Sequence, residues 1–137
     1  MTGEILLDTC AVLWVAAGEI SQKAAIALTQ SRDAGLMTYV SPITAWEIGI
    51  LSRRGRFKSS YSPQRWFARL METPATALAA LSPEVLLESS FLPGQIGEDL
   101  ADRIIAATAR EYGFTVMTRD RVLLDYAAQG YLSAMEC

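Results

Sequence analysis

The chain alternates between short apolar runs and longer segments with helical periodicity, and this alternation restricts the fold more than any other feature. The apolar runs predict buried strands at residues 4–8, 36–41, 75–81 and 114–118, with a last strand near 131–134. The intervening segments predict helices at residues 9–17, 21–34, 42–54, 63–72, 83–91 and 99–112, and a short helix from residue 120. Strands that alternate with helices are typical of βαβ units. We therefore expect an α/β fold in which a central, mostly parallel sheet of four to five strands is flanked by helices.

Three of the predicted helices begin with the same pair of residues, at Ser41-Pro42, Ser62-Pro63 and Ser82-Pro83. Serine is a favoured N-cap because its hydroxyl accepts a hydrogen bond from the first turn. Proline suits the first helical position because no N–H donor is needed there. Gly35 and Gly113 follow two other helices, where glycine commonly adopts the left-handed conformation that ends a helix.

The length of 137 residues suits a single domain, which we expect to span residues 1–137. Apolar residues make up 51% of the chain, which is enough to form a core and argues against disorder. No apolar run approaches the roughly 20 residues of a membrane helix, and Glu4 and Asp8 break the pattern of a secretory signal. The two cysteines, Cys10 and Cys137, are too few for a disulfide framework. We expect a cytoplasmic protein in which Cys10 is a small core residue.

Histidine is absent from the chain, and its absence excludes several kinds of chemistry. Ser-His-Asp and Cys-His catalysis, imidazole-based zinc sites and histidine acid–base catalysis all require it. Acidic residues outnumber basic ones by 15 to 12, giving a formal net charge of −3. Any catalysis must therefore depend on carboxylates, hydroxyls, thiols, basic side chains or a metal ion held by oxygen atoms.

Two aspartates lie at or just after the carboxyl ends of predicted strands. Asp8 closes the first strand, and Asp120 comes two residues after the strand at 114–118. Ligands of open α/β sheets bind at the carboxyl ends of strands, which gives both carboxylates a functional interpretation. Each could instead simply cap the helix that follows it.

Glu47 lies on a predicted helix with an apolar stripe, formed by Ile43, Trp46, Ile50 and Leu51. Its position within this stripe directs the carboxylate towards the interior. A buried carboxylate must be protonated, paired or bound to a metal, because burying it alone costs several kcal/mol. The structural alternative is an ion pair with an arginine such as Arg103.

Asp99 and Asp102 lie three residues apart at the start of a helix, so their side chains are neighbours. They could serve only as an N-cap and a first-turn acid. The apolar residues that follow Asp102 place this helix deep in the core, however. If the four acids Asp8, Glu47, Asp102 and Asp120 converge, they form an oxygen-only site of the kind that suits Mg²⁺ or Mn²⁺.

Four segments together resemble the PIN-domain ribonucleases, and above all the VapC-type toxins of toxin–antitoxin pairs. They are Leu6-Leu7-Asp8-Thr9, Ala45-Trp46-Glu47-Ile48, the segment from Ala101 to Ala109, and Met117-Thr118-Arg119-Asp120. The resemblance covers residues 5–125 and implies a PIN-like three-layer sandwich with the activity of a Mg²⁺- or Mn²⁺-dependent endoribonuclease. It also implies a homodimer, an RNA substrate and a cognate VapB-like antitoxin whose C-terminal segment covers the site.

By the same resemblance, Asp8, Glu47, Asp102 and Asp120 are the catalytic and metal-binding acids, and Asp99 has a lesser role. Thr9 and Thr118 lie next to two of these acids, so their hydroxyls are candidates for orienting ligands or phosphate. Related toxins often carry histidine where this chain has Gly97, a departure that bears on substrate preference.

Two rival functions share this acidic pattern. A catalytically silent PIN-like binding module would keep the fold without the metal, and the presence of all four acids argues against it. A phosphatase with Asp8 as nucleophile usually has a second aspartate two residues on, where this chain has Cys10.

Half of the basic residues fall between residues 53 and 69. The densest part follows the Glu47 helix directly and contains Arg53, Arg54, Arg56 and Lys58. Basic side chains interleaved with aromatic ones suit phosphate contact and base stacking. This basic stretch is a candidate contact for RNA or for an acidic antitoxin tail, and its alternative role is a solvated helix end.

Overall fold

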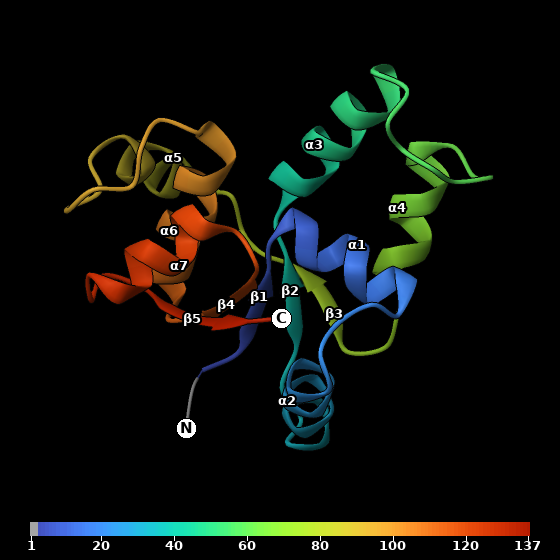
Figure 1. Cartoon of the computed structure of the whole chain (residues 1–137), viewed down its shortest axis with the longest axis horizontal. Coiled ribbons are helices and arrows are strands. Elements are labelled where there is room, and N and C mark those ends of the chain that lie inside the picture. The colour runs from blue at the N-terminus through green and yellow to red at the C-terminus, as the bar shows by residue number, and fades with distance from the viewer. Residues whose placement is uncertain (1–2) are drawn as a thin grey trace.

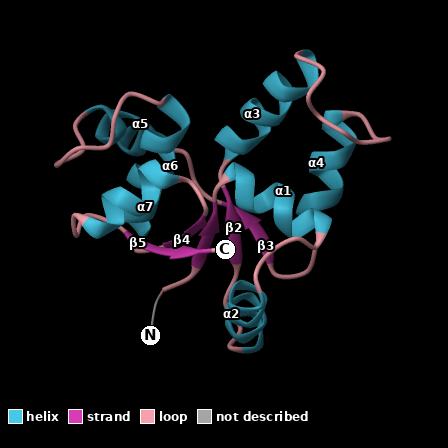
Figure 2. Ribbon diagram, viewed as in Figure 1, coloured by secondary structure: helices cyan, strands magenta, loops and turns pink. Residues whose placement is uncertain are grey.

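Five parallel strands form the centre of the molecule (Figure 2). The computed structural model describes residues 3–137, so residues 1 and 2 of the expected domain lie outside it. The strands run in the order β3-β2-β1-β4-β5. Their bounds are Ile5–Leu7 for β1, Thr38–Val40 for β2, Thr76–Leu78 for β3, Thr115–Thr118 for β4 and Ser133–Glu136 for β5. The predicted α/β class and sheet are confirmed. The last strand begins two residues later than expected, because a turn after the final helix occupies the intervening residues.

Seven helices connect and cover these strands. They are α1 (Thr9–Ala17), α2 (Gln22–Asp33), α3 (Pro42–Arg53), α4 (Pro63–Met71), α5 (Pro83–Ser90), α6 (Leu100–Tyr112) and α7 (Arg121–Ala128). The predicted Ser-Pro starts are confirmed. The hydroxyls of Ser41, Ser62 and Ser82 accept hydrogen bonds from backbone N–H groups in the first turns of α3, α4 and α5.

The two faces of the sheet bury separate apolar clusters, because side chains alternate along a strand. In β1, Leu6 packs with residues of α5, α6 and α7, whereas Ile5 and Leu7 pack with residues of α1, α2 and α4. This arrangement gives three layers, with the helices on both sides of the sheet (Figure 1). Within residues 3–137 no single helix is long and apolar enough to cross a membrane. Only α1 and α2 taken together reach that composition, as a pair bent by 95°.

Two side chains lie on the opposite side of their helices from the prediction. Trp46 is 51% exposed, and the buried residues of α3 are Ile43, Thr44 and Ile48. The predicted apolar stripe is wrong at Trp46 alone, since Ile43 is buried and Ile50 and Leu51 are partly buried. The helix leaves the sheet and packs against other helices, so only part of its surface is covered (Figure 1). Cys10 is exposed rather than buried, because Ala11 and Val12 form the inner face of α1.

The connections between strands reverse direction around β1. From β1 the chain builds outward through β2 to β3, then crosses back to place β4 on the other side of β1. Such a switch point leaves a crevice at the carboxyl ends of the two central strands, where ligands of open α/β sheets bind. The segments that follow β1 and β4 carry Asp8 and Asp120.

Candidate active site

Asp8 is held rigidly at the end of β1. Its Oδ1 accepts a hydrogen bond of 2.8 Å from the backbone N–H of Ala11, and the hydroxyl of Thr118 donates to its Oδ2. Asp8 is only 5% exposed. Burial raises the pKa of Asp8 and the charge of Asp120 raises it further, while the two hydrogen bonds act in the opposite direction. The N-cap and functional interpretations are therefore compatible, because one oxygen caps α1 and the other faces β4.

Asp120 is fixed through its backbone more than through its carboxylate. Its N–H donates to the hydroxyl of Thr118 over 2.8 Å. Asp120 occupies the N-cap position of α7 but its side chain makes no capping hydrogen bond. Within residues 3–137 its buried Oδ2 has no hydrogen-bond partner at all. A buried oxygen left free in this way is available to a ligand.

Glu47 reaches back from α3 to the start of α1. The hydroxyl of Thr9 donates to its Oε1, and the hydroxyls of Thr9 and Thr44 lie 3.0 Å apart. Partial burial raises the pKa of Glu47, Thr9 lowers it, and the charges of neighbouring acids raise it again. The alternative ion pair with Arg103 does not occur, because that guanidinium binds elsewhere.

Asp99 and Asp102 open α6, as predicted. Asp99 is the exposed N-cap, and its carboxylate accepts a 2.9 Å hydrogen bond from the N–H of Asp102. Burial raises the pKa of Asp102 to about 8, and the charge of Asp120 is the next largest cause. The charges of Asp99 and Glu47 act in the same direction.

The four predicted acids therefore lie within electrostatic reach of one another. Desolvation, followed by the charges of Asp8, Glu47, Asp120 and Asp102, raises the pKa of Cys10 to about 11. No cation is among the causes of the raised pKa of Asp8, Glu47 or Asp102. Within residues 3–137 the ion pairs of the structure involve none of these four acids, and two hydroxyls are bound to their carboxylates.

This donor set fits a hard divalent cation. It consists of carboxylate oxygens, and it includes the unpartnered Oδ2 of Asp120. Among the side chains of residues 3–137, no three form a complete ligand group by themselves. Mg²⁺ commonly binds through one or two carboxylates and keeps several water ligands, so these acids suit that mode.

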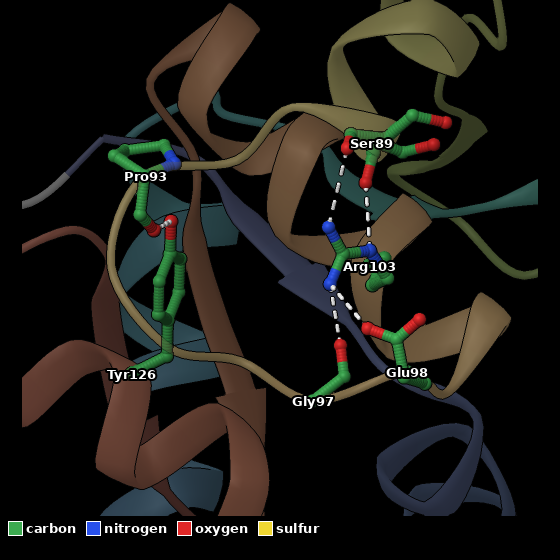
Figure 3. A network of polar contacts seen from close by, with 7 residues as sticks. Ser89, Pro93, Gly97, Glu98, Arg103 and Tyr126 are labelled. Atoms are coloured by element: carbon green, nitrogen blue, oxygen red, sulfur yellow. Dashed lines mark hydrogen bonds and ion pairs between the residues drawn. The ribbon is translucent and has the colours of Figure 1, made fainter.

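The loop between α5 and α6 is anchored by two side chains that the sequence did not identify in this role (Figure 3). Arg103 donates to the carbonyls of Ser89 (2.9 Å) and Gly97, and it lies 3.7 Å from the carboxylate of Glu98. Tyr126 donates to the carbonyl of Pro93 over 2.6 Å. The loop leads directly into Asp99, so these contacts fix the entry to the acidic cluster.

Replacing Arg103 with methionine is expected to lower the free energy of unfolding by about 2–4 kcal/mol, because several charge-assisted hydrogen bonds to carbonyls at the end of α5 and in the loop are lost at once. Arg110→Met on the same helix is the control. It removes one exposed hydrogen bond to the carbonyl of Tyr131 and a cation–π contact with the ring of the same residue, and it should cost about 1 kcal/mol. Urea denaturation of both variants measures the difference, and equal losses would contradict the anchoring role.

The basic stretch at residues 53–58 lies beyond the end of α3. Arg53, Arg54, Arg56 and Lys58 are all exposed. Six residues of helix separate Glu47 from Arg53, which is about 9 Å along the axis. Further on, Arg65 and Arg69 both stack on the ring of Tyr61. The basic stretch therefore begins at the end of the helix that carries Glu47 and continues into the loop before α4.

The sequence model of the PIN domain matches residues 5–129. The chain belongs to the PIN-domain family. It is 29% identical over 119 residues to Ribonuclease VapC22 of Mycobacterium tuberculosis, a match that covers 87% of this chain and 88% of that protein.

Solved structures show the same PIN fold. The VapBC2 structure from Rickettsia felis, bound to a DNA fragment from its promoter, has a TM-score of 0.68 at 15% identity, covering 96% of this chain and 97% of that one. The structure of PAE2754 from Pyrobaculum aerophilum has a TM-score of 0.63 at 19% identity, covering 99% and 90%. The expected PIN-like three-layer sandwich is confirmed.

Proposed function

We propose that this PIN domain is a Mg²⁺- or Mn²⁺-dependent endoribonuclease and the toxin of a VapBC-type toxin–antitoxin pair, acting in the cytoplasm. The observation that carries the proposal is the cluster of four carboxylates at the switch point of the sheet, none of which forms an ion pair with a basic side chain of residues 3–137. A relative named as a ribonuclease matches most of the chain, and a toxin–antitoxin complex from Klebsiella pneumoniae has a similar fold at 21% identity and a TM-score of 0.59.

In this proposal Asp8 and Asp102 hold the metal directly, and Glu47 and Asp120 complete or orient the ligand group. A divalent ion held by these acids would supply a water of lowered pKa and would stabilise charge on the leaving oxygen. Thr118 fixes the orientation of Asp8, and Thr9 fixes that of Glu47. Glu47 is suited to accept a proton from the attacking water, because its raised pKa brings it closer to neutral pH.

The test is cleavage of end-labelled tRNA, rRNA fragments and mRNA with Mg²⁺ or Mn²⁺, with EDTA as the control. We expect internal cuts that require the metal. If no RNA is cut while RNA is still bound, the protein is the catalytically silent binding module instead.

Growth arrest on regulated expression, relieved by the product of the neighbouring gene, tests the toxin–antitoxin assignment.

The basic stretch gives a separate prediction. The double variant Arg53→Ala/Arg54→Ala is expected to raise KM for RNA about tenfold at moderate salt, with little change in kcat. Loss of two phosphate contacts should also reduce the dependence of log KM on log salt by about 1.4, the value for single strands. Lys23→Ala, which alters an exposed cation on α2, is the matched control. If KM stays constant while affinity for the antitoxin falls, the stretch binds the antitoxin rather than RNA.

We propose that the protein forms a homodimer. Several large apolar side chains are exposed, among them Phe91 at 78% and Leu87 at 66%. Exposed apolar surface of this kind indicates a partner. Sedimentation equilibrium measures the mass, and a monomer at micromolar concentration would contradict the proposal.

A further inference from the structure

Arg119 has the most extensive set of contacts of any exposed side chain near the acidic cluster. One terminal nitrogen of its guanidinium, Nη2, donates to the carbonyl of Glu19 over 2.7 Å and to the carbonyl of Cys137 over 2.9 Å. The guanidinium carbon lies 3.9 Å from the centre of the Trp14 ring. Trp14 is on α1, Glu19 is in the loop before α2, and Cys137 follows β5. One side chain thus joins three segments that are separate in the sequence.

The backbone of Arg119 lies between two residues of the site. Thr118 precedes it, donates to Asp8 and accepts a hydrogen bond from the N–H of Asp120. The carbonyl of Thr118 also accepts from the N–H of Cys137 over 3.1 Å. A shift of Arg119 would therefore move both Thr118 and Asp120.

Asp120 depends on this backbone support, because apart from a hydrogen bond shared with the carboxyl group of Asp102 its side chain has few contacts. It makes no capping hydrogen bond to α7, and its Oδ2 has no partner within the described part of the chain. The two oxygens of Asp8, in contrast, are each held by a hydrogen bond. Among the acids of the cluster, Asp120 is thus the one whose position rests most on the turn at residues 118–120.

We propose that Arg119 is a positioning residue, which clamps the turn between β4 and α7 to α1 and β5 and so holds the carboxylate of Asp120 in the acidic cluster. The clamp requires a guanidinium because one planar group must bridge two carbonyls while it stacks on an indole ring. Within the described part of the chain Arg119 forms no ion pair with these acids, and its guanidinium binds main-chain oxygens instead. Arg119 acts through geometry. This inference rests on the proposed metal-dependent nuclease.

Arg119→Met tests the clamp, because methionine keeps an apolar stem on Trp14 but removes both hydrogen bonds. Residues that orient metal ligands typically contribute about 10–100-fold to metal affinity or activity. We therefore expect a Kd for Mn²⁺, measured by electron paramagnetic resonance without RNA, that is raised about tenfold. We also expect kcat to fall about tenfold with KM for RNA changed less than about twofold. Arg121→Met is the matched control, because Arg121 lies two residues on and makes only an exposed ion pair with Asp125. It should bind Mn²⁺ like the wild type.

Arg119→Lys is the second variant, and it tests the positioning role of Arg119 if the methionine variant does not fold. Lysine keeps the charge and most of the stem but cannot bridge both carbonyls and stack at once, so Mn²⁺ binding should still weaken at least threefold. A folded Arg119→Met or Arg119→Lys protein with wild-type Mn²⁺ affinity and kcat would overturn the inference. If the wild type cleaves no RNA, the proposed nuclease fails. In that case the role of Arg119 is tested by the Kd for Mn²⁺ alone.

Discussion

Replacing Asp8 with asparagine is expected to lower kcat for RNA cleavage by about 100-fold or more, with the fold intact. Asparagine keeps an oxygen that can accept from the N–H of Ala11, so the cap of α1 survives. It removes a negative oxygen that a divalent cation would contact. Residues that only orient metal ligands already contribute about 10–100-fold, so loss of a ligand should cost at least the upper end of that range.

Asp102→Asn is expected to have a similar effect on kcat, since this carboxylate lies in the same cluster on α6. Single-turnover cleavage with saturating enzyme separates the chemical step from binding. Asp125→Asn removes an exposed carboxylate from α7 and serves as the control. If both site variants cleave RNA as fast as the wild type, the assignment of the metal-binding acids is wrong.

The metal-free protein is expected to lose stability as the pH rises from about 4 to about 8. The pKa of Asp102 is raised to about 8 in the folded state from an ordinary value of 3.8. In this range the folded protein therefore holds a proton that the unfolded chain releases, and each rise in pH favours unfolding. Burial raises the pKa of Asp8 and Glu47 as well, so their contributions have the same sign. Differential scanning fluorimetry in EDTA should show the melting temperature falling by several degrees across this window.

Mg²⁺ or Mn²⁺ should reverse this loss. A ligand at about 100 times its Kd stabilises the folded state by about 2.7 kcal/mol, which raises the melting temperature by several degrees in a domain of this size. Asp102→Asn is the informative comparison, because it removes the titrating group. The variant should melt higher than the wild type at pH 8 in EDTA, and its melting temperature should depend less on pH. A melting temperature that rises with pH in the metal-free wild type would contradict the prediction.

The sequence predicted best the acidic residues at the carboxyl ends of the strands. Asp8 and Asp120 were identified because strand ends follow from the alternation of apolar runs, and the topology then brings β1 and β4 together. The position of Trp46 on α3 was predicted wrongly, because periodicity assumes that a helix lies flat on the core, and α3 does not. Arg103 and Arg119 were not assigned their roles, because they bind backbone carbonyls. Every residue supplies a carbonyl, so such contacts have no sequence signature.

The hydrogen bond between Thr118 and Asp8 joins residues 110 positions apart. Contacts of such long sequence separation form late, because the intervening chain must first be ordered. On the ribosome, Asp8 and Glu47 emerge well before β4 can pair with β1, and Asp102 emerges 13 residues ahead of the first residue of that strand, Thr115. A nascent chain that lacks β4 thus carries three of the four acids without the strand that orients them. If the four acids form the proposed metal site, that site is therefore complete only after the C-terminal third of the chain has been made and β4 has paired with β1.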